Sequence, residues 1–169
     1  ILGQTIRESR LCGGEFTLGS ETIRATVIGA GCHSAQLSGS TVFHQNVPFP
    51  LKNVPVVSLA DISRETIRRE LGKQEDSAIL AFPGINSPGY REVAAMAEEI
   101  AAGTGGNALI CLEQDMAKAL GQALALRLGC NAQILCIDRV KVSEGSYLDV
   151  GAPVGPALPV VVKTLVLGK

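Results

Sequence analysis

Apolar residues along this chain form two kinds of pattern. Short apolar runs of strand length occupy residues 55–59, 77–82, 108–112 and 134–137, and turn-forming residues bound them. In the segments between these runs, apolar residues recur every three or four positions, as they do on the buried face of a helix. Strands that alternate with helices predict an α/β fold in which helices flank a mixed, mostly parallel sheet.

Each of the three expected helices has its own start signal. The first begins after Asp61 or Ser63 and runs to about residue 71. The second has Ser87 as its N-cap and Pro88 at its first helical position, where a missing N–H leaves no bond unmade. The third is expected to be capped by Asp115. Glycines that can end these helices stand at positions 72, 103, 105, 106 and 129.

Further strands are expected at 41–43, 139–142, 147–150 and 160–167. Residues 44–51 contain two prolines and should form an extended crossing segment instead. Strands near the two ends are expected to be antiparallel additions to the sheet. Lys163 interrupts the last apolar strand, and we expect it to point outward and protect a sheet edge.

Composition narrows the class of protein. The chain has 169 residues, of which 46% are hydrophobic and 18% charged, with a net charge of −1; these values indicate a globular protein. The chain has no run of Lys and Arg of the kind that indicates nucleic-acid binding. No uncharged apolar run reaches the roughly 18 residues of a membrane span. Because the first residue is not Met, we expect residues 1–22 to be a polar lead-in from a longer chain and 23–169 to form a single α/β domain.

The stretch around residues 26–34 is the candidate ligand site. An apolar, β-branched run is followed by Gly29, Ala30 and Gly31, and then by His33 and Ser34. Small residues at the end of a strand let a phosphate or nucleotide edge approach backbone N–H groups closely. We therefore predict that these five residues form a nucleotide-facing turn. A tight turn that holds no ligand explains the glycines equally well.

A dinucleotide-dependent oxidoreductase is a weaker interpretation of the same glycines. Ser34 stands where the dinucleotide fingerprint needs a third glycine. Leu51 and Lys52 occupy the region, about 20 positions on, where an acidic residue is required. Pro48 and Pro50 leave little room for the helix that should follow.

Cysteine and histidine suggest no catalytic or metal site. The adjacent Cys32 and His33 could suggest a nucleophile, but sequence neighbours rarely supply both roles. The chain has two histidines and five cysteines without a CxxC pair, which disfavours zinc and indicates a reduced, cytoplasmic setting. Cys111 and Cys136 lie in apolar runs and should behave as small hydrophobes. We assign no catalytic residue and no metal ligand.

Four long strings carry a family resemblance. They are VIGAGCHSAQLSGSTVFHQNVPFPLKNVPV, LEQDMAKALGQAL, ILCIDRVKV and YLDVGAPVGPALPVVVKTLV. In this order they closely resemble the ethanolamine ammonia-lyase reactivating factors of the bacterial ethanolamine-utilisation pathway. The resemblance covers nearly all of the chain from about residue 23 onward.

The resemblance implies a fold and a function. This family belongs with the actin and Hsp70-like ATPases, so the chain would be the carboxyl-terminal lobe of an actin-like fold. The full-length protein would be a chaperone that uses ATP and Mg²⁺ to remove damaged cobalamin from ethanolamine ammonia-lyase and to admit intact adenosylcobalamin, which belongs to the partner enzyme. We expect a cytoplasmic protein and leave open a homo-oligomer and a bacterial microcompartment. A fragment that lacks the other lobe should be inactive alone.

Acidic residues offer two further sites. Glu113, Asp115 and Asp138 follow strands, and ligands bind at that edge of open α/β sheets, although a helix cap explains Asp115 without a ligand. Asp149-Val150-Gly151 resembles the Asp-x-Gly phosphate loop of the actin-like superfamily, but a hairpin strand with an exposed aspartate is the better interpretation. A docking domain that holds the lyase and never touches nucleotide is the main alternative function.

Overall fold

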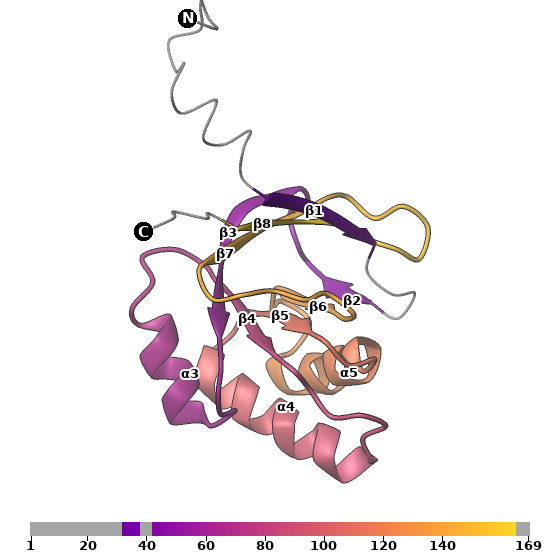
Figure 1. The fold of residues 1–169 in the computed structure, drawn as a ribbon. Helices are drawn as coiled ribbons and strands as arrows, with labels where there is room; N and C mark the ends of the chain where they lie inside the picture. The colour runs from indigo at the N-terminus through magenta and orange to yellow at the C-terminus, as the bar shows by residue number, and fades with distance from the viewer. Residues whose placement is uncertain (1–31, 38–41, 165–169) are drawn as a thin grey trace, which may run out of the picture. The chain divides into compact units, whose positions relative to one another are not determined.

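A computed structural model describes residues 32–37 and 42–164 of the chain (Figure 1). These residues form an eight-stranded sheet and three helices. In chain order the elements are β1 (Cys32–Leu37), β2 (Phe43–Gln45), β3 (Leu51–Ser58), α3 (Arg64–Leu71), β4 (Ile79–Phe82), α4 (Tyr90–Thr104), β5 (Ala108–Leu112), α5 (Ala117–Leu128), β6 (Ile134–Ile137), β7 (Ser146–Val150) and β8 (Pro159–Thr164). The expected strand at 26–28 and the lead-in at 1–22 lie outside the described residues.

The sheet has a parallel centre with antiparallel flanks. Its strand order is β1-β8-β7-β3-β4-β5-β6-β2. The strands β3, β4, β5 and β6 pair in parallel, whereas β1, β8 and β7 on one side and β2 on the other pair antiparallel. The α/β class and the mixed sheet are therefore confirmed, and so are the antiparallel additions. The arrangement is consistent with the actin-like lobe that the resemblance implies.

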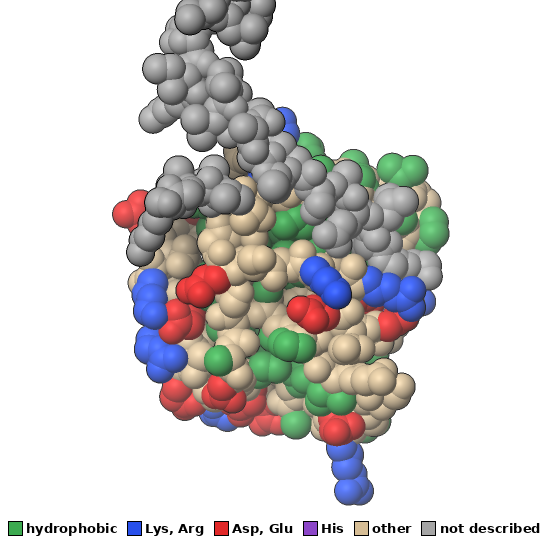
Figure 2. Space-filling view, in the orientation of Figure 1, with side chains coloured by type: hydrophobic (Ala, Val, Ile, Leu, Met, Phe, Trp, Pro, Cys, Tyr) green, Lys and Arg blue, Asp and Glu red, His purple; other side chains and the backbone are tan. Residues whose placement is uncertain are grey.

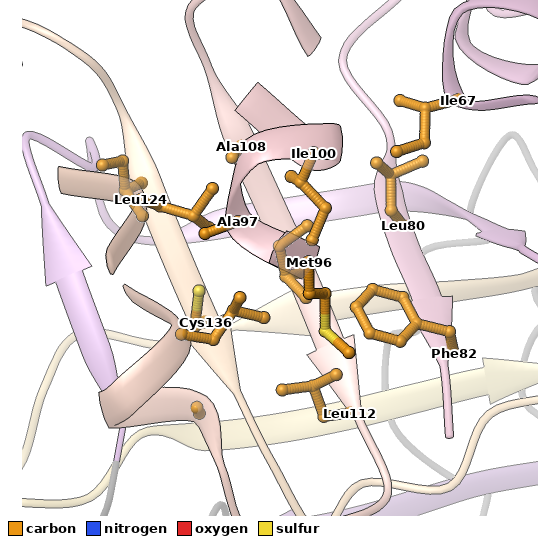
Figure 3. Packing of buried hydrophobic residues seen from close by; sticks show 14 of the residues in the cluster. Ile67, Leu80, Phe82, Met96, Ala97, Ile100, Ala108, Leu112, Leu124 and Cys136 are labelled. Atoms are coloured by element: carbon orange, nitrogen blue, oxygen red, sulfur yellow. The ribbon is translucent and has the colours of Figure 1, made fainter. Parts of the chain in front are cut away.

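The three helices cover one face of the parallel centre. Alternate strand residues, such as Leu80, Phe82 and Leu112, share a buried cluster with Met96 and Ile100 of α4 and with α3 and α5 (Figure 3). The remaining residues of these strands point to the opposite face. Both faces of the parallel centre are thus buried, which explains why its strands are continuous apolar runs in the sequence.

The opposite face is covered by the sheet itself. Ile79, Leu109 and Leu135 of the parallel centre share a second buried cluster with Leu148 of β7 and Val160 of β8. Strands at distant positions in the sheet can share one cluster only if the sheet curls over. The antiparallel part therefore takes the place that a second helical layer holds in other α/β proteins.

Local sequence signals predicted the positions of the helices well, but they predicted the N-cap residue correctly only for α3. Ser63 caps α3 as expected, with its side chain accepting from the Thr66 N–H. The second helix is capped by Gly89 rather than Ser87, because Ser87 adopts a φ of 52° and the Gly89 N–H donates to Glu92 Oε2 at 2.7 Å. The third helix has Met116, not Asp115, as its N-cap residue.

Several predictions about the strands were wrong. Residues 44–51 are not all a crossing segment, because β2 includes residues 44–45 and β3 begins at Leu51. Residues 139–142 do not extend β6, because Arg139 has a φ of 59°, a left-handed conformation that breaks the ladder after Ile137. Lys163 does not protect an edge, because β8 lies between β1 and β7. Instead its Nζ forms an ion pair with Asp149.

An ion pair joins α3 to α4. The Arg64 Nη2 lies 2.8 Å from Glu99 Oε1, and the backbone N–H and Nε of Arg64 both donate to Oε2. The side-chain hydrogen bond from Arg64, followed by the backbone one, lowers the pKa of Glu99 from 4.5 to about 2. Glu99 therefore both pairs with a side chain and satisfies a backbone donor at the start of α3.

Glu99→Gln should lose stability in a pH-dependent way. Because the pKa of Glu99 is lower in the folded state, the carboxylate stabilises the fold above its ordinary pKa of 4.5, and this contribution disappears as pH falls to about 2. Urea unfolding should therefore show a less stable variant at pH 7 and a smaller difference from the native protein at pH 3. Glu144→Gln, at an exposed loop position, is the matched control. A difference that does not change with pH would contradict the assignment.

A close approach between α5 and β2 requires glycine. A Cβ built on Gly121 would lie 2.4 Å from Cβ and Cγ of Phe43, and real atoms do not approach so closely. Gly121→Ala should therefore destabilise the protein by about 1–3 kcal/mol, despite the better helix propensity of alanine. Gln122→Ala, exposed on the same helix, should be close to neutral in the same thermal and urea measurements. Equal stabilities of the two variants would contradict the packing described.

Candidate functional site

The carboxyl ends of the parallel strands meet at one edge of the sheet, where open α/β folds bind ligands. Leu59 follows β3, Pro83 follows β4, Glu113 follows β5 and Asp138 follows β6. The structure thus brings the predicted Glu113 and Asp138 to the same edge. We call this edge, with the loops that follow these strands, the carboxyl edge.

A small cavity opens at the carboxyl edge. Its volume is about 190 Å³. It is lined by Ser58, Leu59, Ala81, Phe82, Pro83, Cys111, Glu113, Val140 and Val142. Most of this lining is apolar, and small-molecule pockets in proteins usually enclose about 300–1,000 Å³. The cavity is therefore smaller than the pockets that usually hold a small molecule.

Asp138 is the buried charged residue of this edge. Its side chain is fully buried, and its Oδ2 accepts a hydrogen bond of 3.1 Å from the Ala117 N–H, the first residue of α5. Met116, the N-cap residue, makes no side-chain cap. The carboxylate of the residue that follows β6 therefore satisfies a backbone donor of α5 and lies at the positive end of the helix dipole.

Asp115 has a different role from the one expected. Its Oδ2 lies 2.5 Å from Arg139 Nη2, and both side chains are largely exposed. The left-handed Arg139 turns the chain after β6, so the pair links the loop after β5 to the loop after β6. The cap that the sequence assigned to Asp115 is supplied by Asp138, which is distant in sequence.

Backbone contacts hold the loops of the carboxyl edge together. The Gln114 N–H donates to the Pro83 carbonyl at 3.0 Å, and the Val140 N–H donates to the Leu112 carbonyl at 3.3 Å. The buried Met116 lies under the loop after β4, with its sulfur 3.3 Å from the Ile85 nitrogen. The carboxyl edge is therefore a connected surface.

Cys111 faces the cavity but is not a nucleophile. Burial, followed by the charges of Glu113 and Asp138, raises the pKa of its thiol to about 12. The thiolate, which is the reactive form, is therefore scarce at neutral pH. Burial likewise raises the pKa of Cys136. Both cysteines behave as small hydrophobes, as expected.

The carboxyl edge carries more acidic than basic side chains. Glu113, Asp115 and Asp138 follow its strands, beside Lys141 and beside Arg139, which pairs with Asp115. Within residues 32–37 and 42–164, no group of three acidic, histidine or cysteine side chains could hold a metal ion.

Asp149 also proves to be a structural residue. Its Oδ1 accepts from the Asn53 N–H at 2.7 Å, and its Oδ2 pairs with Lys163 Nζ at 2.5 Å. The same Nζ donates to Asn53 Oδ1 at 2.8 Å. Burial opposes ionisation, but the hydrogen bonds from Asn53 and Lys163 outweigh it and lower the pKa of Asp149.

This network holds an irregularity in the sheet. Asn53 has a φ of 53°, and the register of β3 on β7 shifts between Leu51 and Val54. Asp149 of the adjacent strand β7 and Lys163 of β8, the next strand beyond it, stabilise that bulge. The hairpin strand is confirmed, but Asp149 is not the exposed aspartate that was expected: its side chain is 28% accessible, and protein groups bind both carboxylate oxygens. The sequence shows the Asp-x-Gly string, but it does not show that the Asn53 N–H donates a hydrogen bond to Asp149.

The predicted nucleotide-facing residues are only partly described. Gly29, Ala30 and Gly31 lie outside the described residues. His33 and Ser34 belong to β1, paired with Lys163 and Val162 of β8, so they continue a strand rather than a turn. In the order of the sheet, β8 and β7 separate β1 from the parallel centre.

Removing the buried cap should weaken α5. Asp138→Ala leaves the Ala117 N–H without its acceptor and should cost about 1–3 kcal/mol of stability. Asp138→Asn keeps an acceptor oxygen and should cost less. Asp115→Ala breaks an exposed ion pair and should cost at most about 1 kcal/mol. Urea unfolding followed by circular dichroism gives these values, and an Asp115 variant less stable than the Asp138→Ala variant would refute the assignment.

Among the described residues, no helix is both long and apolar enough to cross a membrane.

The comparison with solved structures found no match.

Comparison with known proteins identifies the family of this chain. The family model of the ethanolamine utilisation protein EutA matches residues 1–168. Two curated relatives, from Salmonella typhimurium and Escherichia coli, are named ethanolamine ammonia-lyase reactivase EutA. Each is 35% identical over 160 residues, covering 86% of this chain and 34% of the relative, so the chain spans about a third of their length. Because the family model covers nearly every residue, the chain belongs to the family of the ethanolamine utilisation protein EutA.

Proposed function

We propose that the protein containing this chain is a reactivating chaperone for ethanolamine ammonia-lyase. The observation that carries this proposal is the match of residues 1–168 to the EutA family, with relatives named as reactivases of that lyase. In this proposal the whole protein uses ATP and Mg²⁺ to exchange damaged cobalamin for intact adenosylcobalamin. The coenzyme belongs to the lyase, and the chaperone opens access to it.

The chain contributes only part of that activity. It spans about a third of the relatives, at 34% of their length, and its carboxyl edge is acidic, with a cavity of about 190 Å³. We therefore propose that the glycine stretch 29–31 faces nucleotide only when the rest of the protein is present. The isolated chain should bind and hydrolyse ATP poorly.

A reactivation assay tests the proposal. Full-length protein is mixed with inactivated ethanolamine ammonia-lyase, ATP, Mg²⁺ and adenosylcobalamin, and the recovery of lyase activity is followed. Recovery should exceed that of lyase incubated without the protein, and it should require hydrolysable ATP. Recovery no greater than in the sample without the protein would overturn the proposal, and recovery without ATP would overturn its ATP dependence.

A docking domain is the second candidate function. It is favoured by the acidic carboxyl edge and by Asp149, whose two carboxylate oxygens are both engaged by Asn53 and Lys163. In that case this part of the protein holds the lyase, and the remainder binds nucleotide. Gly31→Leu in the full-length protein separates the two cases: a nucleotide-facing turn predicts weaker ATP binding, whereas a docking domain predicts unchanged ATP binding.

A further inference from the structure

The cavity at the carboxyl edge has an apolar floor and a polar mouth. Its floor is made of side chains that are at most 5% exposed, namely Leu59, Ala81, Phe82, Cys111 and Val140. Ser58 and Glu113 also line the cavity, and both are exposed. Water on such a floor finds few hydrogen-bond partners, so its replacement by an apolar group is favourable.

The walls of the cavity are tied to one another by hydrogen bonds. The Leu59 N–H donates to the Ala81 carbonyl at 2.8 Å, and the Val140 N–H donates to the Leu112 carbonyl at 3.3 Å. The Cys111 Sγ lies 3.8 Å from the Val140 carbonyl oxygen. A cavity whose walls are already ordered loses little conformational entropy when a ligand enters it.

Glu113 supplies the charge of the cavity. Among the described residues that line it there is no Lys, Arg or His, and Lys141 does not belong to the lining. The other two acids of the carboxyl edge are engaged, Asp115 by an arginine and Asp138 by a backbone N–H. Glu113 forms no hydrogen bond or ion pair with the described residues. Its carboxylate is therefore available to a ligand.

The surface around the cavity does not select a ligand by a broad electric field. Figure 2 shows acidic and basic side chains interspersed over the face that it presents, and the net charge of the chain is only −1. Selection must therefore come from the mouth of the cavity, where a carboxylate and the Ser58 hydroxyl accept hydrogen bonds. A carboxylate attracts a cation and repels carboxylates and phosphates.

The size of the cavity limits the ligand to a few atoms. Its volume is about 190 Å³, and a water molecule occupies roughly 30 Å³ of the liquid, so there is room for about six non-hydrogen atoms. An alkyl chain of about four or five carbons covers the apolar floor and brings a terminal ammonium to Glu113. We propose that this cavity binds an alkylammonium group, which a free aliphatic amine or a lysine side chain can supply. This inference does not rest on the proposed function.

Butylammonium chloride tests the inference on the full-length protein. Isothermal titration calorimetry should give one site with a Kd of about a millimolar, and sodium butyrate should not bind. Glu113→Gln should raise the Kd for butylammonium about tenfold or more, because it removes the charge at the mouth. Neutral butanol should bind the native protein and the variant alike. Because Glu113 is exposed, the variant should unfold at the native temperature.

Two controls separate the cavity from non-specific binding. Glu144→Gln removes the same charge from an exposed loop and should bind butylammonium with native affinity. Affinity should rise from ethylammonium to butylammonium and fall at octylammonium, because the cavity holds about six atoms. No binding of butylammonium, equal binding by the native protein and Glu113→Gln, or an affinity that continues to rise with chain length would each overturn the inference.

A competition experiment distinguishes the two sources of the alkylammonium group. If the site takes a lysine side chain, Nα-acetyl-lysine methylamide will displace butylammonium. If it takes a free amine, the peptide groups of that compound will exclude it, and butylammonium will stay bound; either result supports the inference. Neither assay contains lyase or ATP, so a failed reactivation assay leaves this inference standing, and a lack of amine binding leaves the proposed function standing.

Discussion

Burial of the central strands on both faces is the constraint on which this structure depends. Every residue of β4, β5 and β6 is buried, so each strand needs an apolar layer on either side. Three helices supply one layer, and the curled antiparallel strands supply the other. The glycines at 103 and 121 allow the helical layer to pack tightly, because a Cβ at either would meet a neighbouring side chain at under 3 Å.

The same constraint explains where polar groups gather. A sheet whose centre is buried on both faces can expose polar side chains only at the ends of its strands and on its antiparallel flank. The carboxyl edge carries Glu113, Asp115 and Asp138, of which Asp138 is tied to the start of α5. On the flank, Asp149 and Lys163 hold the bulge at Asn53. These charged groups mostly stabilise turns and helix ends.

Much of the fold could be predicted from periodicity, because both strand and helix patterns are local. The strand 108–112 and the helix capped by Ser63 are found where they were expected. The errors share a different cause. Arg139 and Ser87 adopt left-handed backbone conformations, which a sequence pattern does not reveal for residues other than glycine. The strand at β1, where a turn was expected, depends on pairing with β8, which is more than 120 positions away.

The residues of the candidate site were likewise predicted only in part from the sequence. By itself, the sequence determined which segments are apolar, which acids follow strands, and, through its characteristic strings, the family to which the chain belongs. Tertiary structure alone decided that Asp138 rather than Asp115 caps α5, that Lys163 lies inside the sheet, and that both oxygens of Asp149 are engaged. The reason is physical: a residue's propensity acts within a few positions, whereas the partner of a buried charge is chosen by the packing of elements that are distant along the chain.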